Sequence, residues 1–362
     1  MPLHAGHCPP WLFARMKRLG AAITAAIVEE HGETEFLRRI SNPFFFQSLG
    51  CVLGFDWHSS GVTTTVCGAL KEGLEMDAHG ILVAGGKGGA SRKAPDEIRE
   101  IGKSAGLDSE NLVKASKLSA KVDSAAVQDG FQLYHHCFFI SRGGEWAVVQ
   151  QGLKVPEGAG LDWLGAVNGG RARRYHWLGE GVKSFVDEPH AAVCCDERGR
   201  ALNMVARESG GARRASVDAL NDGDYRGFVG GQTPLSAFSG DFKQLKMQRG
   251  HLVDLRQYRA LEEMREFAPS NYGELIALKG MGPKAVRALA LVAELVYGEE
   301  PSWRDPARYS FAHGGKDGTP RPVDRGLMVE SSAFLEQAVE GARIGAGERA
   351  ACLKRLVQLT LK

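Results

Sequence analysis

The feature that most constrains this chain is a glycine pair followed by proline and lysine, Gly280-Met281-Gly282-Pro283-Lys284. Glycines allow a sharp backbone turn with positive φ, and proline is well tolerated at the first position of a helix, where an N–H is not needed. Apolar residues recur at spacings of three and four on both sides of the turn. They are Leu275, Ile276 and Leu278 before it, and Val286, Leu289, Ala290, Ala293, Val296 and Tyr297 after it. The sequence therefore predicts two helices joined by a tight turn.

The start of the second helix has the properties of a phosphate site. Its first N–H groups, the positive end of the helix dipole and the Lys284 ammonium would converge on one spot. A helix-hairpin-helix of this kind holds the backbone of a nucleic acid without reading its bases. We therefore predict that Gly280, Gly282 and Lys284 contact DNA. The alternative is an ordinary helix–helix corner, since such corners often contain glycine.

A second motif, Arg321-Pro322-Val323-Asp324-Arg325, follows after a long loop. Together with the hairpin it resembles the DNA glycosylases of the helix-hairpin-helix superfamily, in which a Gly/Pro-rich loop ends in aspartate. In bifunctional members the lysine after the hairpin attacks C1′ of the sugar and forms a Schiff base, and the aspartate activates it. The resemblance implies a DNA glycosylase with AP-lyase activity that needs no cofactor, with Lys284 as nucleophile and Asp324 as its partner.

Both residue types suit this chemistry. A lysine nucleophile must lose its proton near neutral pH, which desolvation or a neighbouring cation can bring about. A carboxylate is suited to a developing oxocarbenium charge. A phosphate-binding lysine would keep its proton, so the role of Lys284 depends on whether it points into a pocket or at a phosphate.

The whole chain also resembles an uncharacterised archaeal and bacterial family, known only as a domain of unknown function. This resemblance runs from the segment Gly50-Cys51-Val52-Leu53-Gly54-Phe55-Asp56-Trp57-His58-Ser59-Ser60-Gly61 to Pro322-Val323-Asp324-Arg325. It implies membership of a family and no particular activity.

Composition sets broad limits on the protein. A chain of 362 residues with 43% hydrophobic and 24% charged residues is typical of a globular protein of two or three domains. The net charge of +2 does not by itself indicate nucleic-acid binding, although a chain with a small net charge can still carry local basic patches. The seven cysteines form no Cys-x-x-Cys pair, which argues against a zinc ribbon, so no metal site is predicted there. With no visible signal peptide or membrane span, we expect a cytoplasmic protein.

The order of elements predicts an α+β fold. We expect a mixed domain with antiparallel β-hairpins over residues 1–210, a linker over 211–235, and an all-helical domain with the hairpin over 236–362. One β-hairpin is predicted over 131–151 and another over 191–206. The helical stripe at the end of the chain should pack on the hairpin helices.

The predicted β-hairpin over 131–151 supports a rival enzyme. Magnesium-dependent nucleases build sites from acids on neighbouring strands, with histidine or glutamine as helpers. In strict alternation His135 shares a face with Leu133 and Cys137, and His136 shares the other with Tyr134 and Phe138. The candidate residues for a Mg²⁺- or Mn²⁺-dependent DNA nuclease are Asp123, Asp129, His136 and Gln151, together with Asp56 and His58 of an earlier Gly-bounded segment. The alternatives are buried polar groups with internal partners, and a capped turn before a threonine-rich strand at 62–66.

Two basic segments could add contacts to DNA. A glycine-rich loop carries Lys87, Arg92 and Lys93, and could wrap a phosphate or be a mobile surface loop. The segment 171–177 mixes Arg173 and Arg174 with aromatic residues, a composition used on single strands. A third class of function, a non-catalytic DNA-binding module, would explain the hairpin and leave the other polar segments structural.

Overall fold

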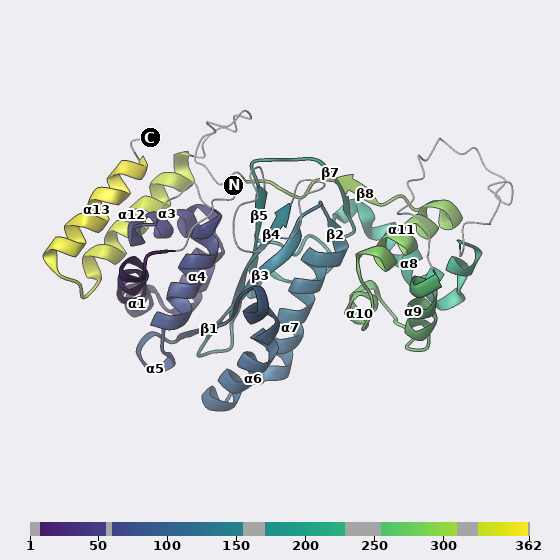
Figure 1. Ribbon diagram of the computed structural model, residues 1–362, viewed down its shortest axis with the longest axis horizontal. Coiled ribbons are helices and arrows are strands. Elements are labelled where there is room, and N and C mark those ends of the chain that lie inside the picture. The colour runs from purple at the N-terminus through teal and green to yellow at the C-terminus, as the bar shows by residue number, and fades with distance from the viewer. Residues whose placement is uncertain (1–7, 56–59, 155–170, 229–254, 310–324, 361–362) are drawn as a thin grey trace.

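The computed structural model describes residues 8–55, 60–154, 171–228, 255–309 and 325–360. A five-stranded sheet lies in the middle of the molecule (Figure 1). All its strand pairs are antiparallel. In spatial order the strands are β1 (Ile81–Lys87), β3 (Gln132–Ser141), β4 (Trp146–Lys154), β5 (Arg171–Leu178) and β6 (Ala192–Cys194). The predicted α+β class is confirmed.

Strands β3 and β4 form the first predicted hairpin and lie near the centre of the sheet. The pairing of β3 with β4 shifts between Leu133 and His135, so that Tyr134 forms a bulge. Leu133 consequently lines the same cleft as His136. The Tyr134 hydroxyl instead bonds Gln151, the residue opposite His135. The prediction that Leu133 shares a face with His135 is wrong, because the bulge breaks the alternation.

A layer of helices covers one face of the sheet (Figure 1). Its members from the start of the chain are α1 (Pro10–His31), α2 (Glu33–Ser41), α3 (Pro43–Leu53) and α4 (Gly61–Gly73), followed by the short α5 (Met76–His79). The last helices, α12 (Arg325–Gly341) and α13 (Ala346–Thr360), pack on α3 in the same layer. The Arg355 guanidinium donates to the Val52 carbonyl at 2.9 Å. The prediction that the C-terminal stripe packs on the hairpin helices is therefore wrong.

Local sequence explains how α3 begins and why α4 is a helix. Asn42 caps α3 by accepting from the Phe44 N–H at 2.9 Å, and Pro43 occupies the first turn. The threonine-rich segment forms helix α4 rather than the strand considered as an alternative. Its buried residues recur with helical spacing, which places them on one side: they are Val62, Thr63, Val66, Cys67, Ala69 and Leu70.

The opposite face of the sheet is covered by the segment after β1. This segment forms the 3₁₀ helix η1 (Gly88–Lys93), α6 (Ala94–Ala105), α7 (Ser109–Lys121) and the single π turn η2 (Val122–Ala126). In Figure 1, α6 and α7 lie on the side of the sheet away from α1 and α13. The two faces of the sheet therefore contribute to two separate apolar cores.

A small second sheet joins the middle of the chain to the later helices. It consists of β2 (Val127–Gln128), β7 (Arg200–Asn203) and β8 (Ser302–Arg304). The short 3₁₀ helices η3 (Gly179–Gly181) and η4 (Arg207–Ser209) lie in the connections. The predicted hairpin over 191–206 is wrong, because β6 pairs with β5 while β7 pairs with β2 and β8.

The hairpin helices form a cluster beyond the second sheet (Figure 1). The cluster contains α8 (Gly210–Asp222), η5 (Asp224–Phe228), α9 (Leu255–Arg265), α10 (Tyr272–Ala277) and α11 (Pro283–Tyr297). Leu275, Met281 and Val286 belong to the same apolar core as Phe138 and Trp177 of the large sheet. Part of the segment predicted as a linker, residues 211–222, belongs to α8. In the described ranges, no helix is both long and apolar enough to cross a membrane.

Candidate functional site

The glycine-rich turn joins α10 to α11 as two helices meeting at a tight corner. Gly280 has φ of +93°, whereas Gly282 has an extended backbone with φ of −115°. The turn is closed by the Met281 N–H, which donates to the Leu278 carbonyl at 3.2 Å. Pro283 occupies the first turn of α11, and Gly282 offers its first N–H groups no side-chain cap. The first glycine alone needs the left-handed conformation, so the two glycines are not equivalent.

Two side chains fix this turn to the sheet region. The Lys121 ammonium, at the end of α7, lies 3.4 Å from the Leu278 carbonyl oxygen. The Gln128 amide donates to the Pro283 carbonyl at 2.7 Å, and its oxygen accepts from Arg287 at 2.7 Å. The hairpin is thereby held against α7 and β2 at a defined position.

A cleft of about 680 Å³ opens between α7, the start of α6, β3 and the end of α10. Lys114, Lys117 and Lys121 line it at spacings of three and four, so they share one face of α7. Arg92 from η1 also lines it. The one acid of its lining within the described residues, Glu110, is bonded to Arg99 at 2.8 Å. The cleft is therefore basic and is bordered by the residues that lead into the hairpin turn.

Lys121 differs from its neighbours in burial. Lys114 and Lys117 are exposed, whereas Lys121 is half-buried. Burial lowers the pKa of the Lys121 ammonium, because a charged group loses hydration there. In the described part of the chain, no ion pair with a carboxylate opposes this effect. A lysine with these properties gives up its proton more readily than a surface lysine.

A chain of buried polar groups begins at the wall of the cleft. Ser116 and His136 line the cleft, and their side chains are bonded at 2.8 Å through His136 Nε2. His136 Nδ1 lies 2.8 Å from Gln150 Oε1. The Gln150 amide nitrogen then donates to Asp123 at 2.5 Å. Asp123 is fully buried and also accepts from Trp177 at 2.9 Å and from His190 at 2.5 Å.

The hydrogen-bond partners within this buried polar network determine which of its atoms carry protons. The Gln150 amide nitrogen faces two acceptors, the Asp123 carboxylate and the Ser119 carbonyl, so its oxygen faces His136. His136 must then carry its proton on Nδ1, and Nε2 accepts from the Ser116 hydroxyl. Burial lowers the pKa of His136, which favours this neutral form. His136 is thus a neutral base within hydrogen-bond reach of a hydroxyl at the cleft wall.

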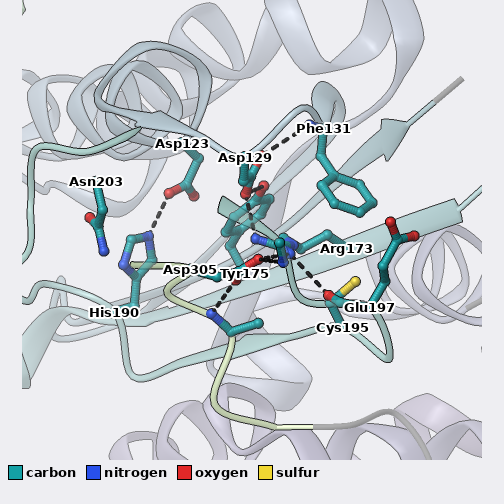
Figure 2. A network of polar contacts seen from close by, with 12 residues as sticks. Asp123, Asp129, Phe131, Arg173, Tyr175, His190, Cys195, Glu197, Asn203 and Asp305 are labelled. Carbon is teal, nitrogen blue, oxygen red and sulfur yellow. Dashed lines mark hydrogen bonds and ion pairs between the residues drawn. The ribbon is translucent and has the colours of Figure 1, made fainter. Parts of the chain in front are cut away.

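A second buried network lies near His190 and centres on Arg173. Figure 2 shows the Arg173 guanidinium between Asp129 and Asp305, at 2.9 and 2.8 Å. Asp129 also accepts from the Tyr175 hydroxyl at 2.7 Å. A cavity of about 230 Å³ next to this network is lined by His190 and Asp305, among others. The network ties the segment after β8 to strand β5.

The face of the sheet toward the helical layer carries a different set of polar groups. The Arg174 guanidinium donates to His176 Nε2 at 2.8 Å and to Gln47 at 3.2 Å. On the same face, Cys67, His135 and Cys137 bring three potential metal-ligand atoms within 4.8 Å of one another. All three are buried.

Comparison with protein families gives one match over most of the chain. The model of the family described as "Protein of unknown function (DUF763)" matches residues 1–323. The chain belongs to this family. The resemblance to an uncharacterised family is thereby confirmed over residues 1–323. Comparison of the sequence with curated proteins and with solved structures found no match.

In this family member, the residues predicted for lyase chemistry are only partly described. Lys284 lies exposed in the first turn of α11, so the desolvation that a lysine nucleophile needs is not provided there. Asp324 lies outside the described residues, as do Asp56 and His58 of the nuclease prediction. The better environment for a neutral amine is that of Lys121.

The nuclease residues do not converge on one open site. Asp123 and Asp129 lie in separate buried networks and are occupied by internal donors. His136 faces the cleft, while Gln151 lies on the other face of the sheet and donates to the Ser60 carbonyl at 3.0 Å. These four residues do not form one metal site in this structure, because His136 and Gln151 lie on opposite faces of the sheet and the two aspartates lie in separate networks.

The basic residues predicted to contact DNA outside the hairpin fall into an exposed group and a buried group. Lys87, Arg92 and Lys93 are exposed on and beside η1, and Arg92 lines the basic cleft. Arg173 and Arg174 are 1% and 0% exposed and bond internal partners, so neither is available to DNA in this conformation. The arginine–aromatic mixture of β5 is a buried strand rather than a binding surface.

Sequence reasoning missed several of the site residues. The lysines of α7 repeat at helical spacing, and that periodicity could have placed them on one face. Asp305 and His190 have no local signal, since each joins its network through the packing of distant segments.

Proposed function

We propose that the protein binds nucleic acid, holding the phosphate backbone between the lysine face of α7 and the hairpin turn. The observation that carries this proposal is the position of the hairpin, whose Leu278 carbonyl lies 3.4 Å from the Lys121 ammonium inside a basic cleft. Phosphate contacts by lysine and by helix N-termini supply much of the affinity of such proteins and do not depend on sequence.

The arrangement explains how a chain of nearly balanced charge could bind a polyanion. The net charge is only +2, but the cleft gathers Arg92, Lys114, Lys117 and Lys121. Exposed Lys279 and Lys284 lie on the adjoining turn and helix. A local cluster of one sign attracts a phosphate backbone even when the whole protein is close to neutral.

Fluorescence anisotropy of a labelled DNA duplex and a labelled single strand, over a series of salt concentrations, tests this proposal. Replacing Lys114 and Lys117 by glutamine should lower the magnitude of the slope of log K against log salt by about 0.9 for each lost duplex contact. The control replaces two exposed cations of the helical layer, Arg343 between α12 and α13 and Lys354 within α13, and removes the same charge. Equal losses in both double variants would contradict the proposal.

A second candidate function is AP-lyase activity with Lys121 as the nucleophile. This residue is half-buried at the cleft, and burial lowers its pKa, as a Schiff-base lysine requires. The cleft of about 680 Å³ falls in the size range of sites for small ligands, and could receive a sugar turned out of a strand.

The chemistry can be written with groups present in the cleft. The Lys121 amine would attack C1′ of the opened abasic sugar, and loss of water would leave a Schiff base. The Ser116 hydroxyl, which donates to neutral His136 in the cleft wall, would then take the C2′ proton and pass its own proton to His136 Nε2 as the bond to the 3′ phosphate breaks. No metal ion enters these steps.

Borohydride trapping on a duplex with an abasic site, in EDTA, separates the candidates. We expect a covalent adduct with the wild type and with Lys284→Gln, and none with Lys121→Gln. Loss of the adduct in Lys284→Gln alone would identify Lys284 of the hairpin, and not Lys121, as the nucleophile. Absence of an adduct with the wild type would exclude the lyase reaction and leave the binding proposal intact.

A further inference from the structure

We propose that Cys67, His135 and Cys137 form a binding site for one thiophilic transition-metal ion, for which Zn²⁺ is the expected occupant. One ligand atom from each residue lies within 4.8 Å of the other two. Zinc is held in proteins by cysteine sulfur and histidine nitrogen in this way. This inference concerns the face of the sheet away from the basic cleft and does not rest on the proposed DNA binding.

The strongest observation is the state of His135. Its side chain is 1% exposed, and neither ring nitrogen has a hydrogen-bond partner among the described residues. An imidazole buried without partners is unfavourable, because it loses its hydrogen bonds to water and gains none in return. A metal ion bound to one of these nitrogens would remove part of this deficit.

The polypeptide brings the three residues together from two elements. His135 and Cys137 are two residues apart on β3, beyond the bulge at Tyr134, and therefore point to the same face. Cys67 comes from α4, which packs on that face within the same apolar core. The site would thus connect the helical layer to the centre of the sheet.

The donor set determines which ions suit it. Two thiolates would balance the two positive charges of the ion, which matters because Cys67 and Cys137 are fully buried. Sulfur and imidazole donors favour zinc and other thiophilic ions over Mg²⁺ or Ca²⁺, which prefer oxygen. This site therefore differs in metal preference from the Mg²⁺ or Mn²⁺ site considered from sequence.

A fourth donor is available on the same face. Gln151 pairs with His135 across β3 and β4, and its side-chain oxygen is buried without a hydrogen-bond partner in the described ranges. The amide nitrogen of Gln151 is already held by the Ser60 carbonyl and the Tyr134 hydroxyl. Its oxygen is therefore the group left for a further interaction. Burial of all these residues favours a structural site over a catalytic one, which keeps a position open to solvent.

The metal content of the purified full-length protein, measured by mass spectrometry, tests this inference. We expect one equivalent of zinc per chain in the wild type. Metal-free wild type reloaded with Co²⁺ should show the sulfur-to-cobalt charge-transfer absorption of thiolate ligation. A wild type that binds no transition metal, or whose cobalt spectrum lacks thiolate bands, would overturn the proposal. Discovery of a disulfide between Cys67 and Cys137 in the native protein would overturn it equally.

Two ligand variants and two controls complete the experiment. Cys137→Ser should lose the metal, and His135→Gln should lose it or bind it at least tenfold more weakly. Cys195→Ser changes another buried cysteine, on the opposite side of the sheet in the core with Tyr175, and should keep the full equivalent. Cys8→Ser, at the first described residue, should also keep it. Retention of metal in Cys137→Ser would place the site elsewhere and contradict the proposal.

Discussion

Two neighbouring histidines show how differently the two faces of the central sheet are built. His136 points to the face covered by α7, where each ring nitrogen has a partner at 2.8 Å. His135 points to the face covered by the helical layer, where neither nitrogen has a partner among the described residues. The residues are 3% and 1% exposed, so burial does not distinguish them.

This difference shows that the role of a histidine in this sheet depends on the groups around it on its face, and not on the residue type alone. On the α7 face, polar groups form closed networks below a basic cleft, which is consistent with a surface held rigid for a ligand. On the other face, two thiols and an imidazole meet without hydrogen-bond partners for the imidazole, which is the arrangement on which the proposed metal site rests. The first three of the predictions below test this contrast, and the fourth concerns the turn beside the cleft.

The largest effect is expected in the buried charge network of the α7 face. Replacing Arg173 by methionine would leave Asp129 and Asp305 buried without their cation, so the free energy of unfolding should fall by about 3–5 kcal/mol. Urea unfolding followed by circular dichroism measures this. Arg171→Met, on the same strand but exposed, should change stability by about 0.5 kcal/mol or less. Similar losses in both variants would mean that Arg173 does not hold this network together.

The two histidines provide a direct comparison in metal-free protein. His136→Leu should lower the free energy of unfolding by about 1–3 kcal/mol for each partner left unpaired, namely Ser116 and Gln150. His135→Leu should have a much smaller effect, because no hydrogen bond is lost. The same unfolding experiment in the presence of zinc should reverse the order if the metal site exists. Equal effects under both conditions would contradict the contrast between the faces.

The helical-layer face should also make stability depend on pH. Burial and the adjacent Arg174 hold the pKa of His176 well below its ordinary value of 6.5. Below about pH 6.5 the unfolded chain takes up this proton and the folded chain does not, so the free energy of unfolding should fall by about 1.4 kcal/mol per pH unit. His176→Gln, whose oxygen can still accept from Arg174, should lose this contribution. An unchanged slope in the variant would show that His176 is not its source.

The smallest effect concerns the turn that borders the cleft. Gly280→Ala should lower stability by about 1 kcal/mol, because alanine is strained at φ of +93°. Gly282→Ala should be tolerated, since its φ is −115° and an added methyl group would meet nothing closer than 3.8 Å. Thermal unfolding of the two variants compares them within a single turn. Equal destabilisation would mean that both glycines need special backbone geometry.

Local sequence was sufficient for the elements whose signals lie within a few residues. The turn before Pro283 and the β3–β4 hairpin follow from turn residues and periodicity, and both are found. The partner of the C-terminal stripe was not predictable in this way, because an apolar face specifies burial and not which helix covers it. Strands β6 and β7 show the same limit, since each has the pattern of a strand but pairs in a different sheet.

The candidate sites depended even more on tertiary structure. The bulge at Tyr134 reassigns Leu133 to the other face, and strict alternation cannot reveal it. Cys67 and Cys137 are distant in sequence, so their spacing gave no metal signature. The basic segment of β5 was misinterpreted because composition does not show that Arg173 has buried carboxylate partners.

The central claim, that nucleic acid binds in the cleft between α7 and the hairpin, is tested most directly by lysine footprinting. Acetylation of the full-length protein with and without a DNA duplex, read by mass spectrometry, reports each lysine separately. We expect DNA to protect Lys114, Lys117 and Lys284, and to leave Lys17 and Lys354 of the helical layer unchanged. Binding of DNA without protection of the α7 and hairpin lysines would contradict the account.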